Sequence, residues 1–252
     1  MGELDGQVAL VTGSSRGIGA AIARLFARHG AAVVVHGREE AAVTAVTFDI
    51  EADGGRALSV TGDVTNAEHI ASIRSQAERE LGPISILVAN AGGSPVPPGP
   101  LEELSETDWR RSIDANLTAT FLTVKEFLPG MKARGRGCII TMSSAASRRP
   151  TVHSPGAYAA AKAGIETLTM SLALQAGPAG VRVNCLAPET ILTERNQQLI
   201  PDDVKEQLRR GHPIQRLGTP QDVAEAALYL VSERSSWVTG ITVDIAGGAV
   251  LV

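Results

Sequence analysis

Apolar runs of strand length alternate with longer segments of helical periodicity along almost the whole chain. The strand-length runs occur near residues 8–11, 33–35, 57–60, 84–89, 138–142, 181–186 and 241–245. The helical segments occur near residues 18–29, 39–52, 67–81, 106–133, 156–177, 193–210 and 220–232. Strands that alternate with helices are joined by right-handed crossovers and lie parallel in one sheet. The pattern therefore predicts an α/β fold with a doubly wound, seven-stranded parallel sheet and helices on both faces.

The composition agrees with a sheet that is buried on both faces. Hydrophobic residues make up 44% of the 252 positions and aromatic residues only 3%, so Ala, Val, Ile and Leu must fill the core. Parallel strands covered by helices have this composition. Because the chain contains no internal repeat and no linker long enough to separate two cores, we expect one domain over residues 1–252.

The charge pattern excludes several classes of partner. The formal net charge is −4, so the chain lacks the basic surplus of nucleic-acid-binding domains. No apolar run reaches the length of a membrane span, and the N-terminus has no cationic start before an apolar stretch. Cys138 and Cys185 lack metal-type spacing, which favours two buried free thiols and no metal site. We expect a cytoplasmic protein without a nucleic-acid or membrane partner.

A glycine-rich loop joins the first strand to the first helix, and its glycines are Gly13, Gly17 and Gly19. Glycine lets the backbone approach a pyrophosphate closely, and the helix N-terminus presents free N–H groups and a positive dipole end. The spacing is G-x-x-x-G-x-G, and the alternative is an ordinary strand–helix turn. Its place at the first strand–helix junction of an α/β pattern favours dinucleotide binding.

The residues after the second strand indicate which dinucleotide binds. A site selective for NAD(H) places a carboxylate there to bind the ribose 2′-hydroxyl, but this chain has Arg38 before its first acid, Glu39. The guanidinium groups of Arg38 and Arg16 suit a 2′-phosphate, because they form charge-assisted hydrogen bonds in a planar fork. The alternative is that Arg38 merely begins a solvated helix. We favour NADP(H) over NAD(H).

Two further strand ends carry candidate cofactor contacts. Asp63 ends the third strand and either accepts a hydrogen bond from the adenine amino group or caps the next turn. The segment 90–93, Asn-Ala-Gly-Gly, ends the fourth strand and forms either a small floor beneath the cofactor or a plain turn. Neither segment decides between its two interpretations alone.

Tyr158 and Lys162 lie four residues apart in a predicted helix, so both side chains point to one side. The ordinary tyrosine pKa of about 10 is poorly matched to neutral acid/base work, and a neighbouring ammonium is expected to lower it. The alternative is a tyrosine that packs beside a surface lysine. The chain has only two Tyr and four Lys, so this pairing rarely arises by chance.

Ser144 ends the fifth strand, fourteen residues before Tyr158, and could donate a hydrogen bond to a substrate oxygen that gains charge. A hydrolase nucleophile is the rival role, but no G-x-S-x-G motif surrounds Ser144 and no histidine falls in an obvious partner position. His153 lies nearby in a Pro-rich loop and is interpreted as a surface residue or substrate contact. Asn116 interrupts a helical segment and, taken alone, indicates a buried structural polar group.

Together these residues resemble the classical short-chain dehydrogenase/reductase family along essentially the full chain. The matching pieces occur in order: Thr12-Gly-x3-Gly-Ile-Gly19, Asp63-Val64, Asn90-Ala-Gly92, Asn116, Ser144, Tyr158-x3-Lys162 and Asn184-x3-Pro188. The resemblance implies a single Rossmann-type domain with strand order 3-2-1-4-5-6-7, usually assembled as a homotetramer. It also implies hydride transfer between a nicotinamide and a carbonyl or secondary alcohol.

The resemblance implies a role for each matching side chain. Tyr158 exchanges the proton, Ser144 orients the carbonyl, and Lys162 holds the nicotinamide ribose and lowers the tyrosine pKa. Asn116 supports a water-linked proton relay. The predicted catalytic residues are Asn116, Ser144, Tyr158 and Lys162. The predicted cofactor-binding residues are Gly13, Ser15, Arg16, Gly17, Ile18, Gly19, Arg38, Asp63, Val64, Asn90, Ala91, Gly92, Tyr158, Lys162, Pro188, Ile191 and Thr193.

The chain departs from the family pattern at a few positions. Glu189 follows Pro188 where the family commonly has Gly, which places a carboxylate near the nicotinamide half of the site. Ala246 precedes two glycines where Asp is common. The interval between Ser144 and Tyr158 is one residue longer than in some members.

The segment 189–218 is expected to cover the substrate, because it is amphipathic and carries Arg195, Arg209 and Arg210 among apolar residues. The general layout resembles the branch that reduces 3-oxoacyl groups on a carrier protein, and Arg134 and Arg136 would suit an acidic carrier. A small substrate, free or linked to a carrier protein or CoA, is therefore expected. Sugar or polyol dehydrogenases and secondary-metabolite ketone reductases remain alternatives, and an idle NADP(H)-binding sensor is a remote one.

Overall fold

The computed structural model describes residues 2–152 and 154–251, and its centre is a seven-stranded parallel sheet. The strand order is β3-β2-β1-β4-β5-β6-β7, which confirms the predicted fold class and topology. The strands are β1 (Val8–Val11), β2 (Ala32–Gly37), β3 (Arg56–Thr61), β4 (Ile86–Ala89), β5 (Gly137–Met142), β6 (Val181–Pro188) and β7 (Thr242–Ile245). The register pairs Leu10 with Val34 on one side and with Leu87 on the other. Because these central strands are covered on both faces, their side chains are almost entirely apolar.

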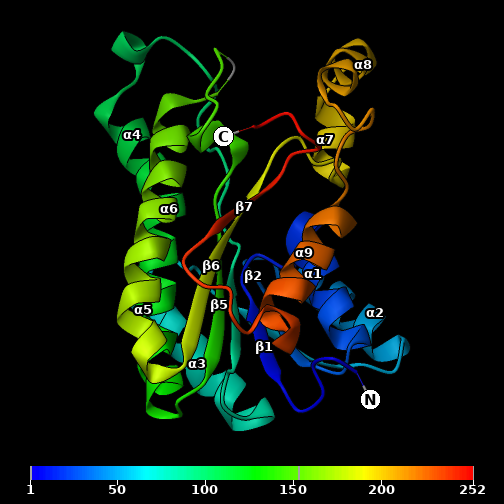
Figure 1. Cartoon of the computed structure of the whole chain (residues 1–252), viewed down its shortest axis with the longest axis vertical. Coiled ribbons are helices and arrows are strands. Elements are labelled where there is room, and N and C mark those ends of the chain that lie inside the picture. Colours follow the sequence, from blue (N-terminus) through cyan, green and yellow to red (C-terminus); the bar gives the residue numbers. More distant parts are fainter. Residues whose placement is uncertain (1, 153, 252) are drawn as a thin grey trace.

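Helices cover both faces of the sheet (Figure 1). One face carries α1 (Gly17–Arg28), α2 (Glu40–Ala52) and α9 (Pro220–Val231), packed around Phe26. The other carries α3 (Ala67–Leu81), α5 (Ala119–Ala133) and α6 (Gly156–Ala176), packed around Phe127 and Met131. Two apolar layers thus hold the strands in place, and the polar residues of the predicted site gather where the strands end.

The long helix predicted over residues 106–133 is divided in the structure. It consists of α4 (Glu106–Ile113), a π-helical turn (Asp114–Thr118) and α5, which follow one another without a break. Asn116 lies in the π-helical turn, and its amide donates to the carbonyl of Ser112 at 2.9 Å. A π-helical turn inserts one extra residue into a helix and often marks a functional position. The pattern of apolar residues alone does not register that insertion.

The predicted helical segment near 193–210 is also divided. It forms α7 (Glu194–Leu199) and α8 (Asp202–Gly211), separated at Pro201. A proline disfavours helical geometry in the residue before it, so α7 ends at that point. Figure 1 shows α7 and α8 projecting above the carboxyl ends of the strands, where a covering segment is expected to lie.

The two thiols lie inside the fold, as the sequence predicts. Cys138 and Cys185 are both free and buried, and burial raises the pKa of Cys138 to about 11. Cys138 contacts the carbonyl of Leu230, with 3.3 Å between its sulfur and that oxygen. Both thiols therefore act as small core residues rather than as reactive groups.

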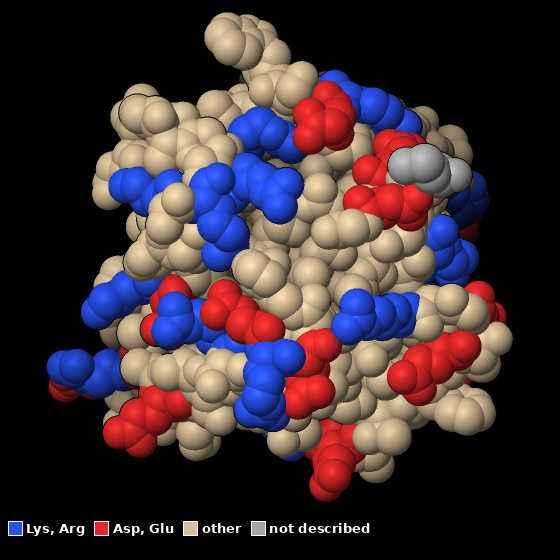
Figure 2. Space-filling view, turned by 90° about the horizontal axis from the view of Figure 1, so that it is seen from below, with Lys and Arg blue, Asp and Glu red and all other residues tan. Residues whose placement is uncertain are grey.

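Two surface observations bear on possible partners. Within residues 2–152 and 154–251, no helix combines the length and apolar character needed to cross a membrane. Figure 2 shows the face below the sheet, where lysine and arginine are interspersed with aspartate and glutamate. Positive side chains gather at the upper left of this view, and the two signs alternate over the rest of it.

Candidate active site

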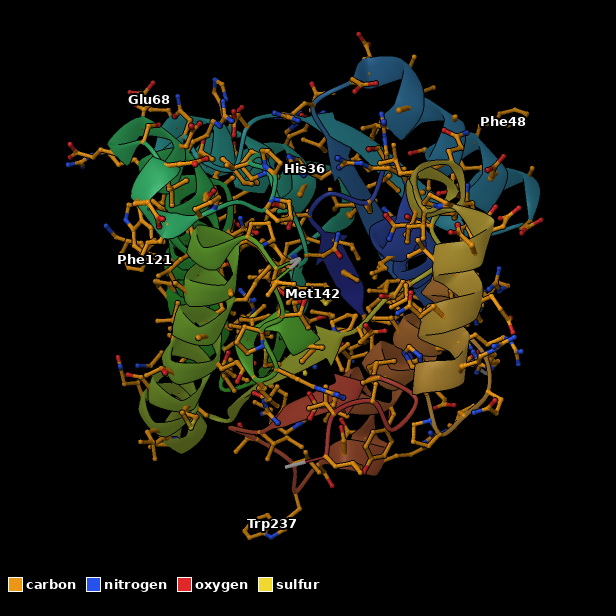
Figure 3. All side chains as sticks on the ribbon, turned by 90° about the horizontal axis from the view of Figure 1, so that it is seen from above. His36, Phe48, Glu68, Phe121, Met142 and Trp237 are labelled. Atoms are coloured by element: carbon orange, nitrogen blue, oxygen red, sulfur yellow. The ribbon has the colours of Figure 1, made fainter. Side chains whose placement is uncertain are left out.

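The predicted site residues meet at the carboxyl edge of the sheet, where ligands bind in open α/β folds. The ends of β1, β2, β4, β5 and β6 converge there, and Figure 3 views this edge from above, with His36 of β2 and Met142 of β5 labelled. Residues that are far apart in sequence are thereby placed around one region.

The glycine loop has the backbone that close contact with a ligand requires. Gly13 and Gly17 have φ values of +66° and +57°, which L-residues with side chains rarely adopt. A Cβ atom on Gly19 would lie 2.4 Å from the carbonyl oxygen of Gly13. No side chain caps the N-terminus of α1, where Arg16 is the N-cap residue, so the first N–H groups stay free for an anion. The loop therefore fits a dinucleotide pyrophosphate.

The loop after β4 fastens the glycine loop from its other side. The Asn90 amide donates to the carbonyl of Thr12 at 2.8 Å, and the Ala91 N–H donates to the Thr12 hydroxyl at 3.0 Å. A Cβ on Gly92 would lie 2.7 Å from the Asn116 amide oxygen, so this segment needs small residues. Asn90, Ala91 and Gly92 thus hold the shape of the site beside the glycine loop.

His36 of β2 contacts the glycine loop and was not predicted from the sequence. The ring Nδ1 of His36 accepts the Gly13 N–H at 3.2 Å, and the backbone N–H of His36 donates to the Ser14 hydroxyl at 2.9 Å. Its Nε2 has no hydrogen-bond partner among the described residues, and burial lowers the pKa of His36 to about 4. His36 is therefore a neutral acceptor that supports the glycine loop. Its place at the end of β2, beside β1, was the available signal.

The residues predicted to select the 2′-phosphate lie at the surface beside this loop. Arg38 is exposed, and Arg16 pairs with Glu39 at 2.8 Å, with both side chains largely exposed. An exposed pair of this kind contributes little stability, so Glu39 does little to hold Arg16 in this position. The hydroxyl of Ser15 lies against Gly37, where a Cβ would approach it to 2.9 Å.

Asp63 adopts the capping arrangement that the sequence left as an alternative. Its Oδ1 accepts hydrogen bonds from the N–H of Thr65 at 2.9 Å and from the Thr65 hydroxyl at 2.8 Å. These bonds lower the pKa of Asp63, and the nearby Arg38 charge adds to the effect. The carboxylate thus lies at the same end of the site as Arg38, while the neighbouring Val64 is buried.

Ser144, Tyr158 and Lys162 come together, as predicted, beside the end of β5. Burial raises the pKa of Tyr158 above its ordinary value, and the adjacent Ser144 hydroxyl opposes part of this shift. The Lys162 ammonium lies 5.5 Å from the centre of the Tyr158 ring. The side chains of one strand end and one helix turn therefore form a single constellation.

Lys162 was expected to lower the pKa of Tyr158, but the pKa of Tyr158 is raised in this arrangement. The Lys162 Nζ donates to the carbonyl of Met142 at 2.7 Å, and burial lowers the pKa of Lys162 to about 8. Of the two effects on Tyr158, burial raises its pKa and the Ser144 hydrogen bond lowers it, whereas Lys162 is not a cause. The burial of Lys162 and the partial burial of Tyr158 outweigh the attraction that the spacing along the helix suggested.

Asn116 is wholly buried, and its side chain forms hydrogen bonds with backbone groups. Its Oδ1 accepts the Gly93 N–H at 3.0 Å, and its Nδ2 donates to the Gly93 carbonyl at 2.8 Å. These two hydrogen bonds to Gly93 give Asn116 the role of a buried structural polar group, as the sequence suggested for Asn116 taken alone. It fixes the start of the Pro-rich loop that follows Gly93.

A polar network behind Ser144 was not predicted. The Glu166 carboxylate accepts from the hydroxyl of Ser143 at 2.7 Å, from that of Ser147, and from Nε of Arg148 at 3.1 Å. Arg148 also bonds Asp244 of β7 at 2.9 Å. The network fixes the turn that carries Ser144 to α6 and to the edge strand. Glu166 lies one helical turn beyond Lys162, which was the only signal in the sequence.

The segment after β6 connects the glycine loop with α7 and α8. Pro188 and Ile191 are buried, and a Cβ on Gly17 would lie 3.2 Å from the Thr193 methyl group. Thr193 also caps α7, because its hydroxyl accepts the Asn196 N–H at 3.3 Å. Thr193 therefore contacts the same loop whose backbone fits a pyrophosphate.

The unusual Glu189 forms a partly buried pair with a histidine of the covering segment. Its Oε2 lies 2.7 Å from Nε2 of His212, whose Nδ1 lies 2.6 Å from the carbonyl of Leu208. The side chain of His212 is only 5% exposed. Glu189, which stands where the family commonly has glycine, thus connects the end of β6 to the C-terminal end of α8. His153, the other candidate histidine, lies outside the described residues.

Comparison with known proteins adds independent support. A family model described as Enoyl-(Acyl carrier protein) reductase matches residues 13–250. The chain belongs to the short-chain dehydrogenase/reductase family. It is 41% identical over 249 residues to cis-4-hydroxycyclohexanecarboxylate dehydrogenase of Sinomonas cyclohexanicum, covering 98% of each chain.

Two solved structures of similar proteins extend the comparison. A 3-oxoacyl-[acyl-carrier protein] reductase from Brucella melitensis has a TM-score of 0.94 and 34% identity, covering 99% of this chain and 93% of that one. A 7α-hydroxysteroid dehydrogenase complexed with NADH and 7-oxo glycochenodeoxycholic acid has a TM-score of 0.92 and 36% identity, covering 97% and 94%. The chain is accordingly an oxidoreductase of a family whose members act on hydroxyl or carbonyl groups.

Proposed function

We propose that the protein is an NADP(H)-dependent oxidoreductase that interconverts a ketone and a secondary alcohol, with Tyr158 as its acid/base. The observation that carries the proposal is the placement of Ser144 next to Tyr158, one helical turn from the buried Lys162 and beside a glycine loop shaped for a pyrophosphate. A catalytically idle sensor would need the loop but not this constellation. The whole chain would work as one functional domain.

Each side chain has a task that follows from its surroundings. When bound, the nicotinamide supplies or accepts the hydride. The Tyr158 hydroxyl gives its proton to the carbonyl oxygen during reduction, and its raised pKa keeps that proton in place at neutral pH. The Ser144 hydroxyl donates a second hydrogen bond to the same oxygen as charge develops there. Lys162 would turn from the Met142 carbonyl toward the nicotinamide ribose.

The preference for NADP(H) rests on the guanidinium groups at the surface of the glycine loop. Arg38 is exposed after β2, and Arg16 has only an exposed partner, so both can face a 2′-phosphate. We expect Arg38→Ala to lower the ratio of kcat/KM for NADPH to that for NADH about tenfold or more, because a charge-assisted contact is lost. An unchanged ratio would refute this role of Arg38.

Several substrates suit a site of this kind, and the relatives narrow the class. Their names point to cyclic alcohols or ketones and to 3-oxoacyl thioesters. We propose a small ketone or alcohol as the substrate, with a carrier-linked 3-oxoacyl group as the second candidate. Arg134, which would face an acidic carrier, instead donates to the Ile84 carbonyl at 2.6 Å, so the free substrate is favoured.

The surface supports assembly into a homotetramer. Several large apolar side chains are exposed, and Trp237, which projects from the molecule in Figure 3, is 98% exposed. Leu174 of α6 and Phe121 of α5 are exposed on neighbouring helices. Apolar surface of this kind favours association with further copies. The free thiols suit a reducing compartment such as the cytoplasm.

A Tyr158→Phe variant tests the proposal. The variant keeps the ring, so it should bind NADPH with unchanged affinity in a fluorescence titration. It should lose nearly all turnover of cyclic ketones, because no group remains to donate the proton. Turnover equal to that of the wild-type enzyme would refute the assignment of Tyr158.

A further inference from the structure

The Pro-rich loop after β4 forms one wall of an open cavity of about 430 Å³. Pro155, three residues before Tyr158, contributes to its lining, so the cavity adjoins the first turn of α6. The lining residues are Ser94, Pro95, Val96, Pro97, Pro98, Pro155 and Arg195. Apart from Ser94 and Arg195, this lining is apolar.

The wall is held rigidly by groups behind it. Asn116 fixes Gly93 through two hydrogen bonds, and Arg111 donates to the Pro95 carbonyl at 2.9 Å while pairing with Asp108 at 3.1 Å. The Ser94 hydroxyl donates to the Val96 carbonyl at 2.7 Å. Because prolines add their own stiffness, little ordering is required when a ligand packs against this wall.

Arg195 is the one charged residue in the lining, and it stands on α7 opposite the proline wall. The other described cations of the covering segment are each paired with a carboxylate: Lys205 with Asp202, Arg209 and Arg210 with Glu206, and Arg216 with Asp222. Across residues 2–152 and 154–251, no ion pair or side-chain hydrogen bond engages Arg195. Its neighbour Glu194 begins α7 and does not line the cavity.

We infer that Arg195 binds a carboxylate on the substrate, whose apolar body packs against the proline wall while its carbonyl reaches Ser144 and Tyr158. This inference rests on the proposed ketone reduction at the same site. A guanidinium forms a planar, two-pronged hydrogen bond with a carboxylate, which a neutral ester or amide does not reproduce. The site therefore takes keto acids or hydroxy acids with a compact apolar body, and Arg195 determines this specificity.

Binding of an unreactive acid tests the inference without turnover. The wild-type enzyme saturated with NADP⁺ is titrated calorimetrically with cyclohexanecarboxylate and with cyclohexanecarboxamide. We expect the acid to bind about tenfold more tightly than the amide, and Arg195→Gln to remove that difference, because one charge-assisted contact is lost. Arg210→Gln, which changes an exposed and paired arginine, is the matched control and should retain the difference. Equal affinities in the wild-type enzyme would overturn the inference.

Turnover separates this inference from the proposed function. With NADPH and 4-oxocyclohexanecarboxylate, Arg195→Gln should raise KM about tenfold, while the KM for the methyl ester stays unchanged. A KM for NADPH that rises equally with both ketones would show that Arg195 serves the dinucleotide phosphates, which overturns the inference. If neither ketone is reduced although acid binding depends on Arg195, the proposed reduction fails and the carboxylate site stands.

Discussion

His36 gives the protein a specific weakness in acid. Burial lowers its pKa from 6.5 to about 4, because the ring lies out of water beneath the glycine loop. Between these values the unfolded chain binds a proton that the folded chain does not, so stability falls as the pH drops below 6.5. Each pH unit is worth about 1.4 kcal/mol, which gives a loss of about 2.5 kcal/mol at pH 4.5 and about 3 kcal/mol at pH 4.

A His36→Asn variant isolates this contribution. The asparagine oxygen can take the place of Nδ1 as acceptor for the Gly13 N–H, but it does not bind a proton in this range. Urea unfolding at pH 7 and pH 4.5 should show that the variant loses about 2.5 kcal/mol less than the wild-type chain. The carboxylates titrate in both proteins and cancel in the comparison.

His29→Asn serves as the matched control for removing a histidine, since His29 lies half-buried at the end of α1. It should lose stability with falling pH as the wild-type chain does. Equal losses for His36→Asn and the wild-type chain would show that His36 does not remain neutral in the fold, and the argument from its burial would be refuted.

Three further predictions follow from the buried charges. Lys162→Met should abolish turnover yet raise the free energy of unfolding at pH 7 by about 1–3 kcal/mol in urea, because the pKa near 8 shows that charged Lys162 is costly to bury; a less stable variant would contradict this. Glu166→Gln should lower kcat about tenfold without changing NADPH affinity, because the network that positions the turn carrying Ser144 is weakened. The surface variant Glu126→Gln is the control and should leave both kcat and NADPH affinity unchanged. Glu189→Ala and His212→Ala should each lower the free energy of unfolding in urea by about 2–4 kcal/mol, because each leaves its partner unpaired. The double variant should lose much less than the sum of the two single losses. Additive losses would show that the two side chains are not coupled.

The sequence predicted the fold closely because the relevant signals are local. Every expected strand occurs, and the helix expected at 67–81 has the bounds observed for α3. The departures have local physical causes that hydrophobic periodicity does not report. Asn116 lies in a π-helical turn, which keeps the apolar pattern while adding a residue, and Pro201 ends α7 inside an amphipathic stretch.

The site could be predicted only where a motif marks it. Ser144, Tyr158 and Lys162 were found because their spacing is distinctive, and they meet in the structure. His36 and Glu166 carry no local signature, since each matters through a partner that is distant in sequence. The direction of the Tyr158 pKa shift was also beyond the sequence, because it depends on how much water the fold removes from the two side chains.

Burial opposes charge on both Tyr158 and Lys162. It raises the pKa of Tyr158 and lowers that of Lys162, so both shifts favour the uncharged form of each group. A substrate oxygen that gains negative charge would favour a charged Lys162, while the Ser144 hydroxyl opposes part of the cost at Tyr158. In the proposed reaction, the interactions that favour charge at this site would therefore be strongest in the transition state, which is the condition for lowering the barrier.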